Sequence, residues 1–294
     1  MGNELKQFID RNIPTIESAM FELVEKISAP AHLKESMLYS LKAGGKRIRP
    51  LFVAAVCEMY NKPLHASYKV GAAVEMIHTY SLIHDDLPCM DDDELRRGKP
   101  TNHVVYGEAL ATLAGDALNT LAFGVLARLE DVTAEKRIEL VDLLSIAAGA
   151  EGMVGGQILD MDGEKRLLNI QELETVHVNK TGALLRFSIE SGAVLADASN
   201  EDRKALVEYA HHIGLAFQIQ DDILDIEGTS EQLGKTAGKD VASEKSTYPA
   251  LLTLDGAKQK LEEHYTFALQ ALQSIKTDTS LLQQFAGYIV RRSN

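Results

Sequence analysis

An acidic stretch follows an apolar run in the first third of the chain. Residues 81–98 read SLIHDDLPCMDDDELRRG, with six carboxylates inside positions 85–94 and arginines at 96 and 97. A solvated acidic loop would explain an isolated run of this kind. Neighbouring carboxylates beside cations are also what a divalent metal ion and a phosphorylated substrate require. The remainder of the sequence has to distinguish these two interpretations.

A second acidic motif, QIQDDILD (218–225), lies at the end of another apolar segment, 136 residues after the first. Asp221 and Asp225 are four positions apart and Gln218 is one turn earlier, so all three share one face of a helix. Like charges at this spacing destabilise a helix unless a cation lies between them. Carboxylate oxygens suit Mg²⁺, and water and substrate phosphates complete its octahedron. The motif therefore predicts a magnesium site.

Asp85 and Asp91 need a different geometry to act together. They are six positions apart, so on an unbroken helix they would point roughly 120° away from each other. Pro88 lacks an N–H and clashes with the preceding turn, which predicts that the helix breaks near Leu87 and Pro88. A bulged or restarted segment would then return Asp91 to the side of Asp85.

Basic residues accompany both acidic motifs, although the net charge of the chain is −13. They are Lys46, Arg47 and Arg49 in GGKRIRP (44–50), Arg96 and Arg97 after the first motif, Lys180 beside Thr181, and Lys235, Lys239 and Lys245 after the second. Arginine binds phosphoryl oxygens in a bidentate manner and lysine binds them as a point charge. The mixture of carboxylates and cations predicts a site for a metal and a diphosphate.

Composition excludes several classes of protein. A net charge of −13 argues against nucleic-acid binding and against electrostatic attachment to an anionic membrane. No stretch reaches the roughly 18 uninterrupted apolar residues of a membrane span. Cys57 and Cys89 form no ligand-spaced pattern, and the N-terminal segment has no apolar core of a secretory signal. We expect a cytoplasmic protein with no membrane or nucleic-acid partner.

Apolar residues recur at helical spacing almost throughout, and no strand is predicted. A single all-α domain over residues 1–294 is the economical interpretation. The stretches 72–78 and 107–129 are apolar nearly all round, which predicts central helices in a thick bundle. The expected helices are 4–27, 32–43, 50–60, 64–86, 103–130, 134–162, 170–196, 200–227, 247–273 and 280–291.

These motifs together resemble the trans-isoprenyl diphosphate synthases, and most closely the farnesyl diphosphate synthases of bacteria. The resemblance covers essentially the whole chain. It rests on motifs in the family's order: GGKRIRP (44–50), EMIHTYSLIHDD with His78, DDLPCMD (85–91) followed by RRG, GGQILD (155–160), NKTGAL (179–184), DDILD (221–225) and GK…GKD…EKSTYP (234–249).

The resemblance implies an all-α bundle of about ten core helices around a deep central cavity, usually as a homodimer. It implies that Asp85, Asp91 and Asp221 bind Mg²⁺, with three ions expected once substrate is bound. Asp86 and Asp225 would support these ligands through water or neighbouring contacts. The catalytic group implied is Asp85, Asp86, Asp91, Arg96, Lys180 and Asp221.

Two diphosphate sites are implied in the same way. The allylic diphosphate would meet Arg96, Lys180, Thr181, Gln218, Lys235 and Lys245. Isopentenyl diphosphate would meet Lys46, Arg49, His78 and Arg97. The implied reaction is magnesium-dependent head-to-tail condensation through an allylic carbocation.

Product length is expected to depend on Tyr80 and Ser81. In the family the residue five positions before Asp85 limits growth of the product tail, and here it is the bulky Tyr80. Farnesyl diphosphate is the predicted product, with the twenty-carbon geranylgeranyl diphosphate as the alternative. A non-catalytic subunit would be expected to have a broken aspartate motif. A terpene cyclase would not need the cations assigned to isopentenyl diphosphate.

Overall fold

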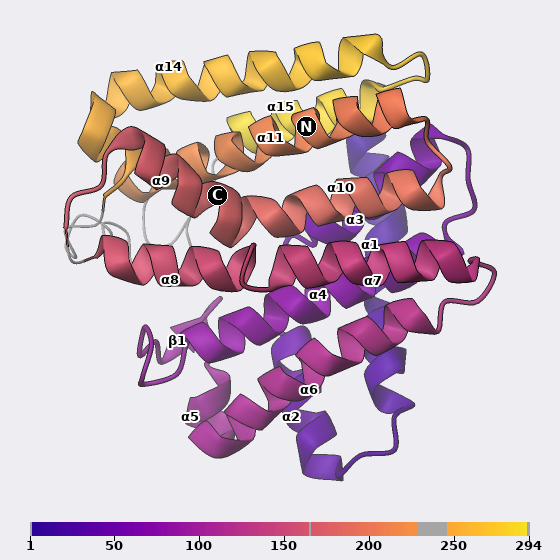
Figure 1. Cartoon of the computed structure of the whole chain (residues 1–294). Helices are drawn as coiled ribbons and strands as arrows, with labels where there is room; N and C mark the ends of the chain where they lie inside the picture. The colour runs from indigo at the N-terminus through magenta and orange to yellow at the C-terminus, as the bar shows by residue number, and fades with distance from the viewer. Residues whose placement is uncertain (1, 165, 228–245, 293–294) are drawn as a thin grey trace.

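The chain folds into a bundle of α-helices, as the sequence predicts (Figure 1). The computed structural model describes residues 2–164, 166–227 and 246–292. The helices are α1 (Asn3–Glu25), α2 (Ala31–Leu41), α3 (Ile48–Met59), α4 (His65–Asp85), α5 (Asn102–Tyr106), α6 (Glu108–Ala127), α7 (Ala134–Ala148), α8 (Met153–Gly163), α9 (Ile170–His177), the π-helix η1 (Val178–Gly182), α10 (Ala183–Leu195), α11 (Asn200–Glu227), α14 (Tyr248–Ala271), the 3₁₀ turn η2 (Leu272–Ser274) and α15 (Ser280–Arg291).

Two apolar clusters fill the bundle. One gathers side chains of α1, α3, α11, α14 and α15, and the other gathers those of α2, α4, α6 and α7. Helix α3 contributes Phe52 to the first cluster and Val53 to the second, and α10 divides Ile189 and Phe187 in the same way. In Figure 1 α3 and α10 accordingly lie between the upper layer of α11 and α14 and the lower layer of α4 and α6. They join the two halves of the core.

The expected helix over 103–130 is two helices, because Gly107 has a φ of 82°. This left-handed backbone ends α5 and begins α6, and glycine adopts it without steric cost. The expected helix over 134–162 is also interrupted, between α7 and α8. There the backbone folds so tightly that a Cβ on Gly152 would lie 2.3 Å from the Ala147 carbonyl oxygen.

The expected central position holds for one of the two apolar stretches. Residues 72–77 of α4 are all buried. Helix α6 packs extensively on α4, yet its opposite face is exposed, and Leu113 on that face is 57% exposed. The apolar residues on this face of α6 are therefore not covered by another helix among the described residues.

A short hairpin follows the first acidic motif and was not expected from the sequence. Strands β1 (Leu95–Arg96) and β2 (Lys99–Pro100) pair in antiparallel fashion. The turn between them contains Arg97 and Gly98, whose φ angles are 54° and 73°. Two positive φ angles match the right-handed twist of a tight hairpin. The hairpin therefore determines the positions of the side chains of Arg96 and Arg97.

Arg47 connects the helices that surround the first basic motif. It precedes α3 in left-handed backbone and is only 3% exposed. Its guanidinium lies 2.9 Å from the carboxylate of Glu75 on α4 and 3.0 Å from that of Glu17 on α1. It also donates a hydrogen bond to the Leu41 carbonyl oxygen of α2. Four helices thus meet at one cation.

We predict that Arg47→Met lowers the free energy of unfolding by about 3–5 kcal/mol, because Glu75 would stay buried without its partner. Denaturant titration measures the change. The matched control is Arg11→Met, which removes an ion pair to Glu58 whose side chains are 59% and 38% exposed. That variant should lose roughly 1 kcal/mol or less. Equal losses in the two variants would contradict the proposed importance of Arg47.

Candidate active site

The first acidic motif has the predicted break. Helix α4 ends at Asp85, and the chain turns through 87–90. The backbone N–H of Asp91 donates a 2.8 Å hydrogen bond to the carbonyl oxygen of Asp85. The two residues are therefore neighbours, although six positions separate them. The prediction that a break near Pro88 returns Asp91 to Asp85 is confirmed.

Two carboxylates of this motif, Asp85 and Asp86, lie in an environment that disfavours their charge. Burial raises the pKa of Asp85 to about 6; Lys180 opposes the rise, Asp91 adds to it, and Arg96 opposes it. Burial also raises the pKa of Asp86. The guanidinium of Arg96 holds Asp86 by a bidentate contact with nitrogen–oxygen distances of 2.5–2.9 Å. A cation that joined Asp85 and Asp91 would relieve their repulsion.

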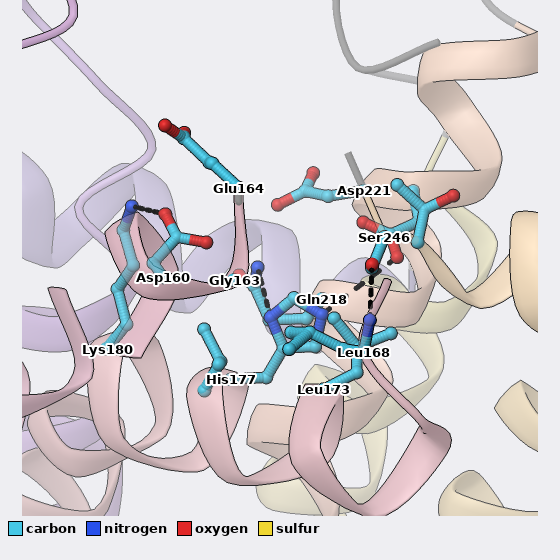
Figure 2. Close-up of a pocket in the computed structure, with 13 residues that line it drawn as sticks. Asp160, Gly163, Glu164, Leu168, Leu173, His177, Lys180, Gln218, Asp221 and Ser246 are labelled. Carbon is cyan, nitrogen blue, oxygen red and sulfur yellow. Dashed lines mark hydrogen bonds and ion pairs between the residues drawn. The ribbon is translucent and has the colours of Figure 1, made fainter. Parts of the chain in front are cut away.

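A polar cavity of about 400 Å³ lies between α8, α9, η1 and α11, and Asp221 and Asp222 of the second acidic motif line it. Figure 2 shows the carboxylates of Asp160, Glu164 and Asp221 around its opening, with His177 and Gln218 deeper inside. The ammonium of Lys180 lies 2.6 Å from Asp160. Burial lowers the pKa of His177 to about 4, so its ring is neutral near pH 7.

Lys180 and Thr181 lie in the π-helix η1 rather than in a regular α-helix. A π turn inserted between α-helices changes the direction of its side chains and occurs often at functional sites. Here it lets Lys180 line the polar cavity and a second, larger cavity at once. Helical periodicity alone does not predict this turn.

The second cavity is predominantly apolar and measures about 540 Å³. Its lining includes the polar residues Asp85, Lys180 and Thr181, together with Arg49 and His78. The other lining residues are Tyr80, Ser81, Leu82, His84, Leu87, Cys89, Met90, Met153, Val154, Gln157, Ile158, Met161 and Leu184. The cavity could hold an apolar chain whose charged end lies among the carboxylates and cations.

Three further cations, Lys46, Arg49 and Arg97, interact with one another electrostatically. The pKa values of Lys46, Arg49 and Arg97 are all lowered, in each case mainly by burial and further by neighbouring cations. Burial also lowers the pKa of His78 well below its ordinary value, with Arg49 and Arg97 contributing. The negative charge of Asp221 acts in the opposite direction and raises the pKa values of Lys46 and Arg49. An anion bound here would relieve the repulsion among these cations.

Arg292 completes the second acidic motif. Its guanidinium lies 2.6 Å from Asp221 Oδ1 and 4.2 Å from the centre of the Phe217 ring. The sequence alone assigns Arg292 no role, because a C-terminal arginine also complements a helix dipole. Arg292 directly follows α15 and packs against α11, where it contacts Asp221, a predicted metal ligand. Asp160 is a second residue of the site to which the sequence analysis gave no role. It appeared there only as part of the GGQILD motif (155–160).

The predicted residues are not all brought together. Asp222 lines the polar cavity, whereas Asp225 is 3% exposed and lines neither of the two cavities just described. Lys235 and Lys245 lie outside the described residues. Gln218 and Asp221 face the polar cavity, and Tyr80 and Ser81 face the apolar one.

The donors at this site fit Mg²⁺. Among the described residues no three histidine, cysteine or carboxylate side chains are placed to hold a metal ion by themselves. Magnesium is commonly bound by one or two carboxylates, with water and substrate phosphates as the other ligands. Asp85 beside Asp91, with Asp221 across the site, offers oxygen donors of that kind.

Comparisons with known proteins identify the family of this chain. The family model described as polyprenyl synthetase matches residues 30–282. The chain belongs to the polyprenyl synthetase family. It is 51% identical to farnesyl diphosphate synthase of Bacillus subtilis over the full length of both chains. It is 44% identical to a chloroplastic geranylgeranyl pyrophosphate synthase of Catharanthus roseus, over 91% of this chain and 76% of the relative.

Solved structures show the same fold. An FPP/GFPP synthase of Zymomonas mobilis superposes with a TM-score of 0.87 at 38% identity, covering 99% of this chain and all of the other. A geranylgeranyl pyrophosphate synthetase of the archaeon Geoglobus acetivorans superposes with a TM-score of 0.88 at 28% identity, covering 99% of this chain. The predicted all-α class and the predicted family are confirmed.

Gly156 of this polyprenyl synthetase lets α8 touch the π-helix. A Cβ at this position would lie 2.2 Å from the backbone nitrogen of Lys180. We predict that Gly156→Ala displaces Lys180 and lowers kcat/KM for prenyl transfer about a hundredfold, since ångström-scale misplacement has costs of this size.

The matched control is Gly124→Ala on α6, where the added methyl would meet only the flexible guanidinium of Arg128. Steady-state assays of both variants, with thermal unfolding to compare stability, measure the difference. A Gly156→Ala protein that is folded and fully active would contradict the required close contact.

Proposed function

We propose that the chain condenses isopentenyl diphosphate head to tail with dimethylallyl and then geranyl diphosphate to give farnesyl diphosphate. One observation carries the proposal: a predominantly apolar cavity is lined by a carboxylate, Asp85, and by the cations Lys180 and Arg49. An allylic diphosphate needs the cavity and the carboxylate side. A second diphosphate needs the cations. The close farnesyl diphosphate synthase relatives support the choice of product.

The carboxylates are assigned to metal binding. Asp85, Asp91 and Asp221 would hold Mg²⁺, with Asp86 and Asp225 in support, and three ions would be present with substrate. The metal, when bound, neutralises phosphoryl oxygens and makes diphosphate a better leaving group. The protein contributes the placement of these oxygen donors at the polar end of the cavity.

The cations assigned to the allylic substrate stabilise the departing diphosphate. Lys180 and Thr181 line the cavity in which the prenyl tail would lie, so their donors are near the allylic C–O bond. As this bond breaks, negative charge grows on the diphosphate oxygens, and fixed donors favour that state. Arg96 and Gln218 would add donors, as would Lys235 and Lys245 in the segment not described. The remaining allylic cation is shielded from water by the apolar walls.

Lys46, Arg49 and Arg97 would bind the diphosphate of isopentenyl diphosphate. The lowered pKa of His78 keeps its ring neutral, so it can donate a hydrogen bond without adding charge. The alkene carbon then attacks the allylic cation, and a carbon–carbon bond forms. The new tertiary cation loses a proton to an oxygen of the departing diphosphate, which restores a double bond. The site then needs no separate protein base.

A homodimer is part of the proposal. Leu113 of α6 and Ile138 and Ile146 of α7 are exposed apolar side chains on helices that lie near each other (Figure 1). By length and composition alone α6 could also cross a membrane. Its packing on α4 and the similarity of the chain to farnesyl diphosphate synthases favour a second copy of the chain as its partner. We further propose one domain over 1–294 and a cytoplasmic location.

The deciding experiment supplies dimethylallyl and isopentenyl diphosphates with Mg²⁺ and follows consumption of both together with the products. We expect farnesyl diphosphate, and no reaction after chelation of the metal. A terpene cyclase would leave isopentenyl diphosphate unused, and a non-catalytic subunit would consume neither substrate. Either result would refute the proposed condensation.

Tyr80 is predicted to limit the product. Its ring lines the apolar cavity and is 9% exposed, with Ser81 beside it. We expect Tyr80→Ala to lengthen the cavity and to shift the main product from farnesyl to geranylgeranyl diphosphate. Chromatography of the dephosphorylated products measures the ratio, and Tyr80→Phe, which keeps the ring, is the control. An unchanged ratio in Tyr80→Ala would show that the ring does not end the cavity.

A further inference from the structure

The last three residues of the EKSTYP motif (244–249) have no role in the proposed reaction, and they begin α14. The hydroxyl of Thr247 accepts a 3.3 Å hydrogen bond from the backbone N–H of Ala250 and caps the helix. Pro249 lies in the first turn, where its fixed φ suits a helix start. Tyr248, between them, is fully buried. The motif therefore determines where α14 begins and buries its first residue.

Asp222 holds this helix start from α11. The backbone N–H of Tyr248 donates a 2.9 Å hydrogen bond to Oδ2 of Asp222, which is only 7% exposed. The first N–H groups of a helix have no acceptor within the helix, and the helix dipole favours a negative charge beside them. Asp222 directly follows Asp221, a proposed metal ligand, yet its carboxylate binds backbone.

His177 packs on the other side of the connection. Its ring stacks on the Tyr248 ring, with centroids 5.7 Å apart and planes at 14°. Its Nε2 lies 4.0 Å from Asp222 Oδ2. His177 is the last residue of α9, and the π-helix that carries Lys180 follows it directly. The three side chains thus join the end of α9, the second acidic motif of α11 and the start of α14.

A further contact holds the other end of α9. The hydroxyl of Ser246 accepts a 3.0 Å hydrogen bond from the backbone N–H of Leu168, which precedes α9 (Figure 2). Ser246 and Thr247 line the polar cavity together with His177 and Asp222. The segment that begins α14 is therefore attached to both ends of α9 on the wall of this cavity.

We propose that Asp222, Tyr248 and His177 form an anchor that positions Asp221 and Lys180 relative to each other, and that Asp222 acts through the backbone of Tyr248 rather than as a Mg²⁺ ligand. The inference rests on the proposed condensation and adds positioning residues to its allylic site. Asp221 lies on α11, and Lys180 follows α9. Because the anchor joins these two elements, it fixes the separation of a metal ligand and a diphosphate donor.

Hydrogen exchange in the ligand-free protein tests the anchor directly. Asp222→Ala removes the acceptor, and we expect the Tyr248 N–H to exchange at least tenfold faster, which matches the loss of a hydrogen bond to a charged group. Asp222→Asn keeps an acceptor oxygen, so the rise should stay within about threefold. The amides of α7, which contributes no residue to the polar cavity, are the internal control and should not change.

Magnesium dependence distinguishes an anchor from a metal ligand. In Asp222→Asn the Mg²⁺ concentration for half-maximal activity should equal that of the wild type. Asp221→Asn removes a proposed ligand and should raise this concentration about tenfold or more. We expect Asp222→Ala to lower kcat about a hundredfold, because an ångström of misplacement has a cost of that size. Asp222→Asn should recover most of that loss.

His177 provides a second pair of variants. His177→Ala removes the stacked ring, and we expect the Tyr248 N–H to exchange about fivefold faster, the scale of one aromatic contact. The KM for geranyl diphosphate should rise, whereas the KM for isopentenyl diphosphate should not, because its proposed cations do not line the polar cavity. His177→Phe keeps a flat ring against Tyr248 and should recover most of both effects.

Wild-type exchange of the Tyr248 N–H in Asp222→Ala or in His177→Ala would overturn the anchor, and either variant decides if the other does not fold. An Asp222→Asn enzyme that needs as much additional Mg²⁺ as Asp221→Asn would show that Asp222 is a metal ligand and would also overturn the inference. A wild-type enzyme that consumes no isopentenyl diphosphate would instead refute the proposed function, while the exchange measurements would still report on the anchor.

Discussion

The mutual repulsion of Asp85 and Asp91 is the interaction on which the rest of the site depends. The turn after α4 holds them together, and burial raises the pKa of Asp85 toward 6. Nearby carboxylates are balanced by cations: Arg96, from the hairpin just after the motif, holds Asp86, and Arg292, from the far end of the chain, holds Asp221. When metal and diphosphate bind, these carboxylates and cations would leave their partners within the protein and make stronger interactions with the ligands. The surrounding helices keep unfavourable charges in place until that exchange occurs.

Such a site needs a rigid frame, and the frame is made by contacts that allow little adjustment. Arg47 joins four helices beside the isopentenyl diphosphate cations that we propose. Gly156 lets α8 approach the backbone of Lys180, and Gly115 lets α6 approach His84. At the two glycines a larger side chain would displace a functional group. At Arg47 an uncharged side chain would leave the helices around it without their shared ion pairs. Positions of this kind connect packing directly to chemistry.

Much of this arrangement is visible in the sequence. The two acidic motifs, the break at Pro88 and the helical class follow from periodicity and from the chemistry of proline and aspartate. The divisions at Gly107 and Gly152 were missed because one or two non-helical residues hardly change an apolar pattern. Arg292 could not be assigned, because its contact with Asp221 joins residues 71 positions apart and depends on tertiary packing. The face that α6 leaves exposed was missed because composition does not reveal which neighbours a helix has.

The π turn at Val178–Gly182 has a consequence for how this chain can vary. A residue inserted into a regular helix rotates everything beyond it by about 100°, which would turn buried side chains of α10 outward. A π turn absorbs one extra residue locally. Helices α9 and α10 therefore keep separate registers, and the segment between them can change in length or direction while the core of α10 stays intact. Evolution can thus adjust the lysine that faces both cavities without rebuilding the bundle.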